Sequence, residues 1–177
     1  PGVVAVAGRA QAFALVSSPK RTYGALIVGV DPAREPGVST IPKSVLQGHY
    51  LSGPNADEAV VGKALAANLS LKVGDEITIL GQGMDGSLAV AALEVVGIFA
   101  SGVPELDRQM VEMPLELFQS SFLLDDRVHT IAVRTADLTA DACVDPLAVF
   151  PVCGSQESGR ISTVHNPEEY DRDRMGL

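Results

Sequence analysis

The sequence predicts an α+β fold that is rich in strands and turns. Of its 177 residues, 17 are glycine and none is tryptophan, a composition that fits such a fold better than a bundle of helices. Several segments are continuously apolar or alternate between apolar and polar residues, which indicates strands, and others carry apolar residues on one helical face. The length suits one domain or two small interleaved ones.

The first half of the chain is expected to begin with a strand hairpin. Residues 3–16 and 22–30 are its two strands, and the turn between them contains Pro19. A short helix is expected at 41–47. Residues 58–69 are helical in composition, although Val60, Val61 and Gly62 make the first turn of that helix ambiguous.

The second half is expected to be built around another hairpin. The glycines at 81, 83 and 86 place its tip at 81–86, because glycine accepts positive φ there. Its strands are 76–80 and 88–99. The remaining predictions are a polar loop at 100–108, a short strand at 109–113, a helix that starts at Pro114, a strand at 127–134, and helices that begin at Asp137 and at Asn166.

The charge of the chain excludes two classes of partner. The formal net charge is −9, so nucleic acid and anionic lipid surfaces would both repel the protein. No window of about 18 apolar residues is present that could cross a bilayer. The sequence begins at Pro1 without a methionine, and we therefore expect further sequence before it.

An ordered set of segments resembles a known family. These segments are YGALIVGVDP (Tyr23–Pro32), VLQGHYL (Val45–Leu51), VGKALAANL (Val61–Leu69), LKVGDEITI (Leu71–Ile79), VVGIF (Val95–Phe99) followed by Ser101-Gly102, and Met113-Pro114-Leu115. Over about residues 3–135 the chain resembles the extracytoplasmic, or periplasmic core, domain of ABC-transporter permeases of the MacB and FtsX-like, lipoprotein-releasing type. No single motif is specific, but their order is.

The resemblance implies a fold in two parts and a place in a larger machine. A porter-like α/β subdomain would comprise residues 1–51 and 126–177, and a small β-rich subdomain would be inserted at 52–125. The domain would lie outside the cytoplasmic membrane, with one membrane helix before Pro1 and several after Leu177. Its implied partners are a cytoplasmic ABC ATPase, a second permease subunit, and a lipoprotein or other exported substrate.

The residues themselves predict no enzyme, cofactor or metal. There is no G-x-x-x-x-G-K-[ST] loop for a nucleotide, and Asp85 has no second acid at calcium-loop spacing. His49, His129 and His165 lie too far apart in sequence for a local zinc motif. The serines lack a Gly-x-Ser-x-Gly elbow.

The two cysteines leave two readings open. An extracytoplasmic location, as the resemblance implies, would allow Cys143 and Cys153 to form a disulfide across the spacer that contains Pro146 and Pro151. The alternative is a pair of free thiols.

The function that fits these observations is substrate or partner binding together with mechanotransmission in a permease. The expected contact residues are Met84 at the hairpin tip and Val103, Pro104 and Leu106 in the 100–107 loop, because apolar residues in loops are available to partners. The alternatives are an extracytoplasmic hydrolase, which would need convergent titratable groups in a pocket, and a sensory domain of a membrane complex.

Overall fold

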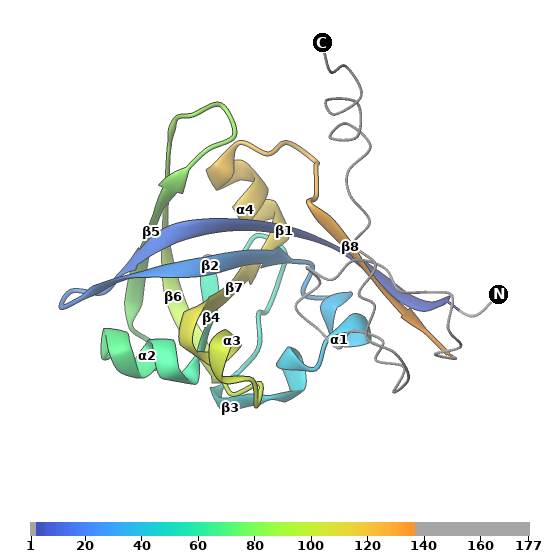
Figure 1. Cartoon of the computed structure of the whole chain (residues 1–177), viewed down its shortest axis with the longest axis horizontal. Coiled ribbons are helices and arrows are strands. Elements are labelled where there is room, and N and C mark those ends of the chain that lie inside the picture. Colours follow the sequence, from blue (N-terminus) through green and yellow to red (C-terminus); the bar gives the residue numbers. More distant parts are fainter. Residues whose placement is uncertain (1–2, 137–177) are drawn as a thin grey trace, which may run out of the picture.

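A computed structural model describes residues 3–136 of the chain. Strands are the predominant regular structure in these residues, with short helices between them (Figure 1). The strands are β1 (Val3–Ser17), β2 (Thr22–Val30), β3 (Val45–Gly48), β4 (Glu58–Gly62), β5 (Glu76–Gln82), β6 (Leu88–Phe99), β7 (Met110–Pro114) and β8 (Thr130–Thr135). The helices are α1 (Glu35–Val38), the 3-10 turn η1 (Ile41–Lys43), α2 (Lys63–Leu69), α3 (Pro104–Gln109) and α4 (Leu115–Phe122).

The main strands form a closed ring. Along the sheet the order is β2-β7-β4-β6-β5-β1, and β1 also pairs with β2, which joins the two ends. The β2–β7 and β4–β6 pairs are parallel and the others are antiparallel. Closure on the β5 side rests on a short contact, in which Leu15, Val16 and Ser17 pair with Leu80, Ile79 and Thr78.

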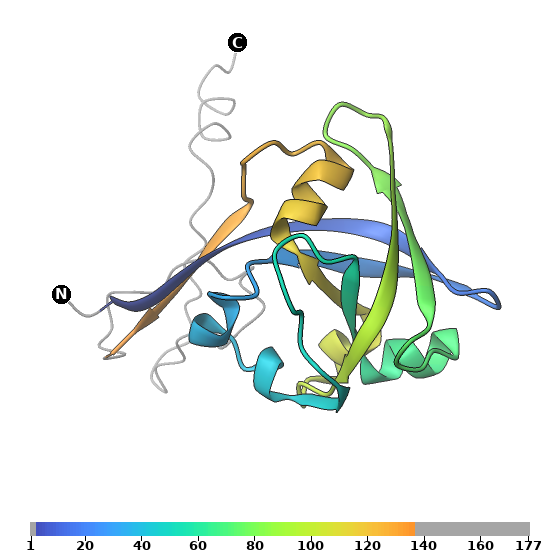
Figure 2. The same ribbon diagram turned by 180° about the vertical axis from the view of Figure 1, so that it is seen from behind.

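The principal core fills the inside of this ring. Every strand of the ring contributes small or branched apolar side chains to it, such as Ala10, Ile27, Val61 and Leu93. The helix α4 adds Phe118 and Phe122, whose rings stack with centroids 4.4 Å apart. In both views α4 lies above the strands and α2 below them, so the two helices cover opposite openings of the ring (Figures 1 and 2).

A second core lies outside the ring. It forms where η1, β3 and the segment after β3, together with Leu106 of α3, cover one part of the outer surface of the strands. Its buried members are Val28, Val30, Ile41, Leu51, Val60, Val96, Phe99 and Met110.

The first half of β1 leaves the ring and pairs with β8 instead. The register runs from Val3↔Thr135 at the free end to Arg9↔Thr130 at the ring. These two strands form a ribbon that extends away from the body in both views (Figures 1 and 2). We call residues 3–9 and 130–135 the ribbon.

The expected α+β class is confirmed, and so are the hairpins at the start of the chain and at 76–99. Three predicted elements are wrong. Residues 58–62 form β4 rather than helix, because Val60 and Val61 are fully buried between β6 and β7. Residues 41–47 form η1 and β3, and the predicted 100–108 loop contains α3, with Pro104 in its first turn.

The predicted division into two subdomains stays a prediction. In the structure, strands from the 52–125 segment share one sheet with β1, β2 and β8. The helices predicted from Asp137 and Asn166 lie outside the described residues. No helix within residues 3–136 is long and apolar enough to cross a membrane.

Candidate functional site

The two ends of the described residues lie side by side. Val3 and Thr135 are paired neighbours at the free end of the ribbon, although 131 residues separate them in the sequence. β1 then continues from the ribbon into the ring, where it pairs with β2 from Arg9 to Ser17. One strand therefore connects the free end of the ribbon directly to the body.

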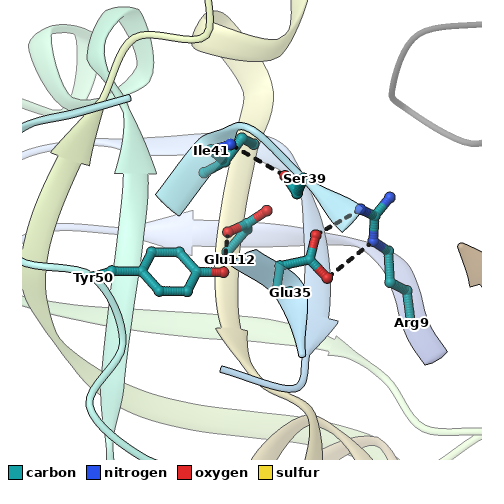
Figure 3. Close-up of polar contacts among 6 residues, drawn as sticks. All are labelled: Arg9, Glu35, Ser39, Ile41, Tyr50 and Glu112. Atoms are coloured by element: carbon teal, nitrogen blue, oxygen red, sulfur yellow. Dashed lines mark hydrogen bonds and ion pairs between the residues drawn. The ribbon is translucent and has the colours of Figure 1, made fainter. Parts of the chain in front are cut away.

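Arg9 marks the junction between ribbon and ring. It is the residue at which β1 pairs with both Thr130 of β8 and Val30 of β2. Its side chain is only 6% exposed and forms a bidentate ion pair with Glu35, which is fully buried in the first turn of α1. The Nε–Oε2 distance is 3.3 Å (Figure 3). This pair fixes α1 to the base of the ribbon.

A second acid lies beside this pair. Glu112 is fully buried in the middle of β7, with Val28 of β2 and Val60 of β4 as its cross-strand neighbours. The Tyr50 hydroxyl donates a 2.8 Å hydrogen bond to Glu112 Oε2 (Figure 3). Glu112 Oε1 has no hydrogen-bond partner among the residues that the structure describes. We call Arg9, Glu35, Tyr50 and Glu112 the buried polar cluster.

Electrostatics in this cluster favour a neutral Glu112. Burial and, next, the negative charge of Glu35 raise the pKa of Glu112 to about 8, although the Tyr50 hydrogen bond and Arg9 act in the opposite direction. Burial and the charge of Glu112 also raise the pKa of Tyr50 far above its ordinary value. The cluster then carries one positive and one negative charge near neutral pH, which avoids an unpaired buried ion.

The segment that carries Tyr50 also borders a pocket. The pocket has a volume of about 360 Å³ and is lined by Asp31–Ala33, Leu51–Pro54, Leu115 and Glu116. Two of the lining residues are close in sequence to members of the buried polar cluster. Leu51 directly follows Tyr50, and Leu115 directly follows β7, the strand that carries Glu112. Ser52 is held separately, by hydrogen bonds from its N–H and hydroxyl to Glu58.

The outer surface of the ring has a bare apolar area. Leu15, Leu80 and Val90 form one row across β1, β5 and β6. Phe13 and Leu88 lie on the same face, two residues before Leu15 and Val90, and are 77% and 71% exposed. We call these five residues the outer apolar face. No described element covers them, in contrast to the part of the outer surface that carries the second core.

The predicted contact residues are in different environments. Met84 is 58% exposed at the hairpin tip, and Val103 is 45% exposed as the residue before α3. Pro104 is also exposed, whereas Leu106 is half-buried and packs against the second core. The structure therefore does not bring these four residues together as one surface. Cys143 and Cys153 lie outside the described residues.

The groups considered for chemistry have structural contacts. Asp85 accepts a hydrogen bond from the Ser87 N–H within the hairpin turn. Hydrogen bonding from the Ser87 side chain and, next, from this backbone N–H lowers the pKa of Asp85. The ring of His129 accepts a 3.0 Å hydrogen bond from the Gln11 N–H. Within residues 3–136, no group of three or more His, Cys, Asp or Glu side chains could hold a metal.

The buried polar cluster is not predicted from the sequence. One signal for it was present, because Glu112 is the only charged residue in the apolar stretch MVEMP, which the sequence had already indicated as a strand. Its partners come from positions 9, 35 and 50, and no local spacing connects them.

Comparisons with known proteins agree with this architecture. The sequence matches the family of MacB-like periplasmic core domains over residues 1–145. The structure is similar to the extracellular domain of the noncanonic ABC-type transporter YknZ from Gram-positive bacteria, with a TM-score of 0.59 and 15% identity. It is also similar to the periplasmic region of MacB from Actinobacillus actinomycetemcomitans, with a TM-score of 0.58 and 10% identity.

These similarities differ in what they cover. The first alignment includes 77% of this chain and 67% of the YknZ domain, and the second includes 80% of this chain and 61% of the MacB region. At such identities the structural similarity shows the fold alone. The comparison with curated proteins finds no match. The family match covers most of the sequence, and the chain therefore belongs to the MacB-like periplasmic core domain family, the extracytoplasmic part of MacB-like ABC transporter permeases.

Proposed function

We propose that this domain binds a substrate or partner outside the cytoplasm and transmits movement between that contact and the membrane part of a permease. The observation that carries the proposal is the ribbon. A domain inserted between two membrane segments must receive and return its chain near one place, and the pairing of Val3 with Thr135, which brings the two ends of the described residues together, supports such an arrangement. A cytoplasmic ATPase, as in ABC transporter permeases, would supply the driving energy.

The mechanical part of the proposal rests on the continuity of β1. This strand runs from the free end of the ribbon into the ring without interruption. At the junction, the Arg9–Glu35 pair connects it to α1, so a displacement of the ribbon would be passed to the ring and, through α1 and the neighbouring η1, to the second core. Packed cores and hydrogen-bonded sheets move as units, which makes such a transfer efficient.

The binding part rests on exposed apolar residues. Phe13 and Leu88 on the outer apolar face, and Met84 and Val103 elsewhere, leave large apolar side chains in water. Contiguous exposed apolar residues are typical of interaction sites. We propose a lipoprotein or another exported molecule as the substrate. A second permease subunit is a further proposed partner.

The mechanical proposal can be tested by loosening the ribbon in the full-length permease. A Gly-Ser-Gly-Ser insert after Val4, with another after Arg134, should abolish transport while ATP hydrolysis and folding of the domain persist. The control is the same insert between Lys20 and Arg21, in the exposed turn of the first hairpin, which should leave transport intact. Normal transport with both ribbon inserts would refute mechanotransmission through the ribbon.

A further inference from the structure

Glu112 has an environment that the proposed function does not require. A carboxyl group in the centre of a ring strand must be either paired or neutral, because an isolated buried charge is very costly. Among the described residues, the carboxyl group of Glu112 has one hydrogen bond, from Tyr50 to Oε2, and its Oε1 has none. The cation in the cluster, Arg9, already forms a bidentate pair with Glu35.

The elements around Glu112 differ in how easily they could move away from it. On either side in the sheet, Val28 and Val60 belong to strands of the closed ring. The group facing it from α1 is Glu35, the one from β1 is Arg9, and the one from the segment after β3 is Tyr50. Residues 49–54, which carry Tyr50, are not part of a strand or helix. We call them the 49–54 segment.

We propose that Glu112 is a proton-controlled latch: its neutral form holds the 49–54 segment on β7, and its ionised form releases that segment and opens the pocket that the segment lines. Ionisation would place two negative charges beside one Arg9, and the added charge would require water. Displacement of Tyr50 is the route by which water can reach Glu112 without breaking the ring. An extracytoplasmic domain is exposed to the pH of its surroundings, so such a latch would make the pocket sensitive to them.

The sign of the pH dependence follows from proton linkage. The pKa of Glu112 is raised in the folded protein from 4.5 to about 8, so between these values the folded state keeps a proton that the unfolded chain has released. The ratio of folded to unfolded protein should therefore fall about tenfold for each pH unit in this interval and level off above it. This contribution is fully present at low pH and is lost as the pH rises.

The decisive experiment is a titration of the 177-residue chain followed by carbon-13 NMR of the glutamate carboxyl groups. One resonance should titrate near pH 8, and Glu112→Gln should remove it. Tyr50→Phe should move the same midpoint downward, because it removes the hydrogen bond that holds the 49–54 segment on neutral Glu112 and so makes release on ionisation easier. An upward shift would mean that Tyr50 stays bonded to the ionised carboxylate, and it would overturn the latch. If Glu112→Gln does not fold, the downward shift in Tyr50→Phe identifies the resonance. A Glu112 midpoint in the ordinary glutamate range would overturn the proposal.

Hydrogen exchange tests the release of the segment. After correction for intrinsic rates, amide protection in residues 49–54 should fall between pH 6 and pH 9 in the wild type and stay constant in Glu112→Gln. The matched control is Glu58→Gln, which weakens the anchor of Ser52 in the same segment but leaves Glu112 in place. It should lower protection at both pH values and keep the pH dependence. A Glu112 that titrates near pH 8 without a change in protection would also contradict the latch.

Discussion

Arg9 is the residue at which β1 exchanges one antiparallel partner for the other. A strand that leaves a closed ring needs support at the branch point, and a buried side chain bonded to α1 provides it.

A glycine of the neighbouring strand has a different role. Gly29 of β2 allows α4 to lie close to the ring, since a Cβ atom there would come 2.6 Å from Cβ of Phe118.

Replacing Arg9 by Met should destabilise the domain by about 3–5 kcal/mol, because Glu35 would remain buried without its cation. The double variant Arg9→Met/Glu35→Gln should recover much of this loss, since no buried charge remains. Urea unfolding of the 177-residue chain measures both values. Equal stability of the Arg9→Met variant and the wild type would show that the pair does not support the junction.

Gly29→Ala should cost about 1–3 kcal/mol, because its methyl group overlaps Phe118 and α4 must shift. The matched control is Gly24→Ala in the same strand, where a Cβ atom would meet nothing within 4 Å. That change should be neutral or slightly stabilising. Thermal unfolding of the two variants side by side distinguishes close packing from a general effect of glycine replacement in β2.

At the scale of elements, α3 places Val103 and Leu106 in different environments, although both were predicted to lie in one contact loop. Val103 precedes the helix and is exposed, whereas Leu106 points toward the second core. Leu106→Ser should therefore lower the free energy of unfolding by about 1–2 kcal/mol, and Val103→Ser should change it by less than about 0.5 kcal/mol.

The same two variants examine the contact role of Val103 in the full-length permease. If Val103→Ser reduces transport while the isolated chain keeps its melting temperature, Val103 belongs to a contact surface. If transport persists, that residue is not part of the binding site. A loss of transport in Leu106→Ser alone would be explained by its lower stability.

Regular elements were predictable from local patterns, and the site was not. The long strands β1 and β6 are continuous apolar or alternating segments, so their limits were nearly correct. The sequence predicts helix over β4 because its short run of small residues joins directly to α2, and only burial between β6 and β7 favours a strand. The buried polar cluster depends on ring closure, which brings Arg9, Glu35, Tyr50 and Glu112 together from four separate segments.

At the scale of the whole molecule, the ring has one surface filled by the principal core and an outer surface that is only partly covered. Leu88 and Leu93 illustrate this within one strand, since Leu88 is 71% exposed and Leu93 is 1% exposed. The side of the strand on which a residue lies therefore decides its contribution more than its type does.

Leu88→Ser should change the free energy of unfolding by less than about 0.5 kcal/mol. Leu93→Ser should reduce it by about 2–5 kcal/mol. If the outer apolar face binds a partner, Phe13→Ser/Leu88→Ser in the full-length permease should weaken transport without loss of folded protein. Denaturation curves and transport assays provide the two readouts. A large loss of stability in Leu88→Ser would mean that this face is covered.

The geometry of the ribbon gives the domain a directional response to load. Hydrogen bonds between antiparallel strands lie across the strand axis. Forces that spread Val3 and Thr135 apart would open their pairs one at a time, starting at the free end. A pull along β1 instead loads its nine pairs with β2 simultaneously, in shear. The ribbon should thus be stiff when its two strands are pulled or pushed along their axis as one unit. It should be weak when the two strands are forced apart at the free end.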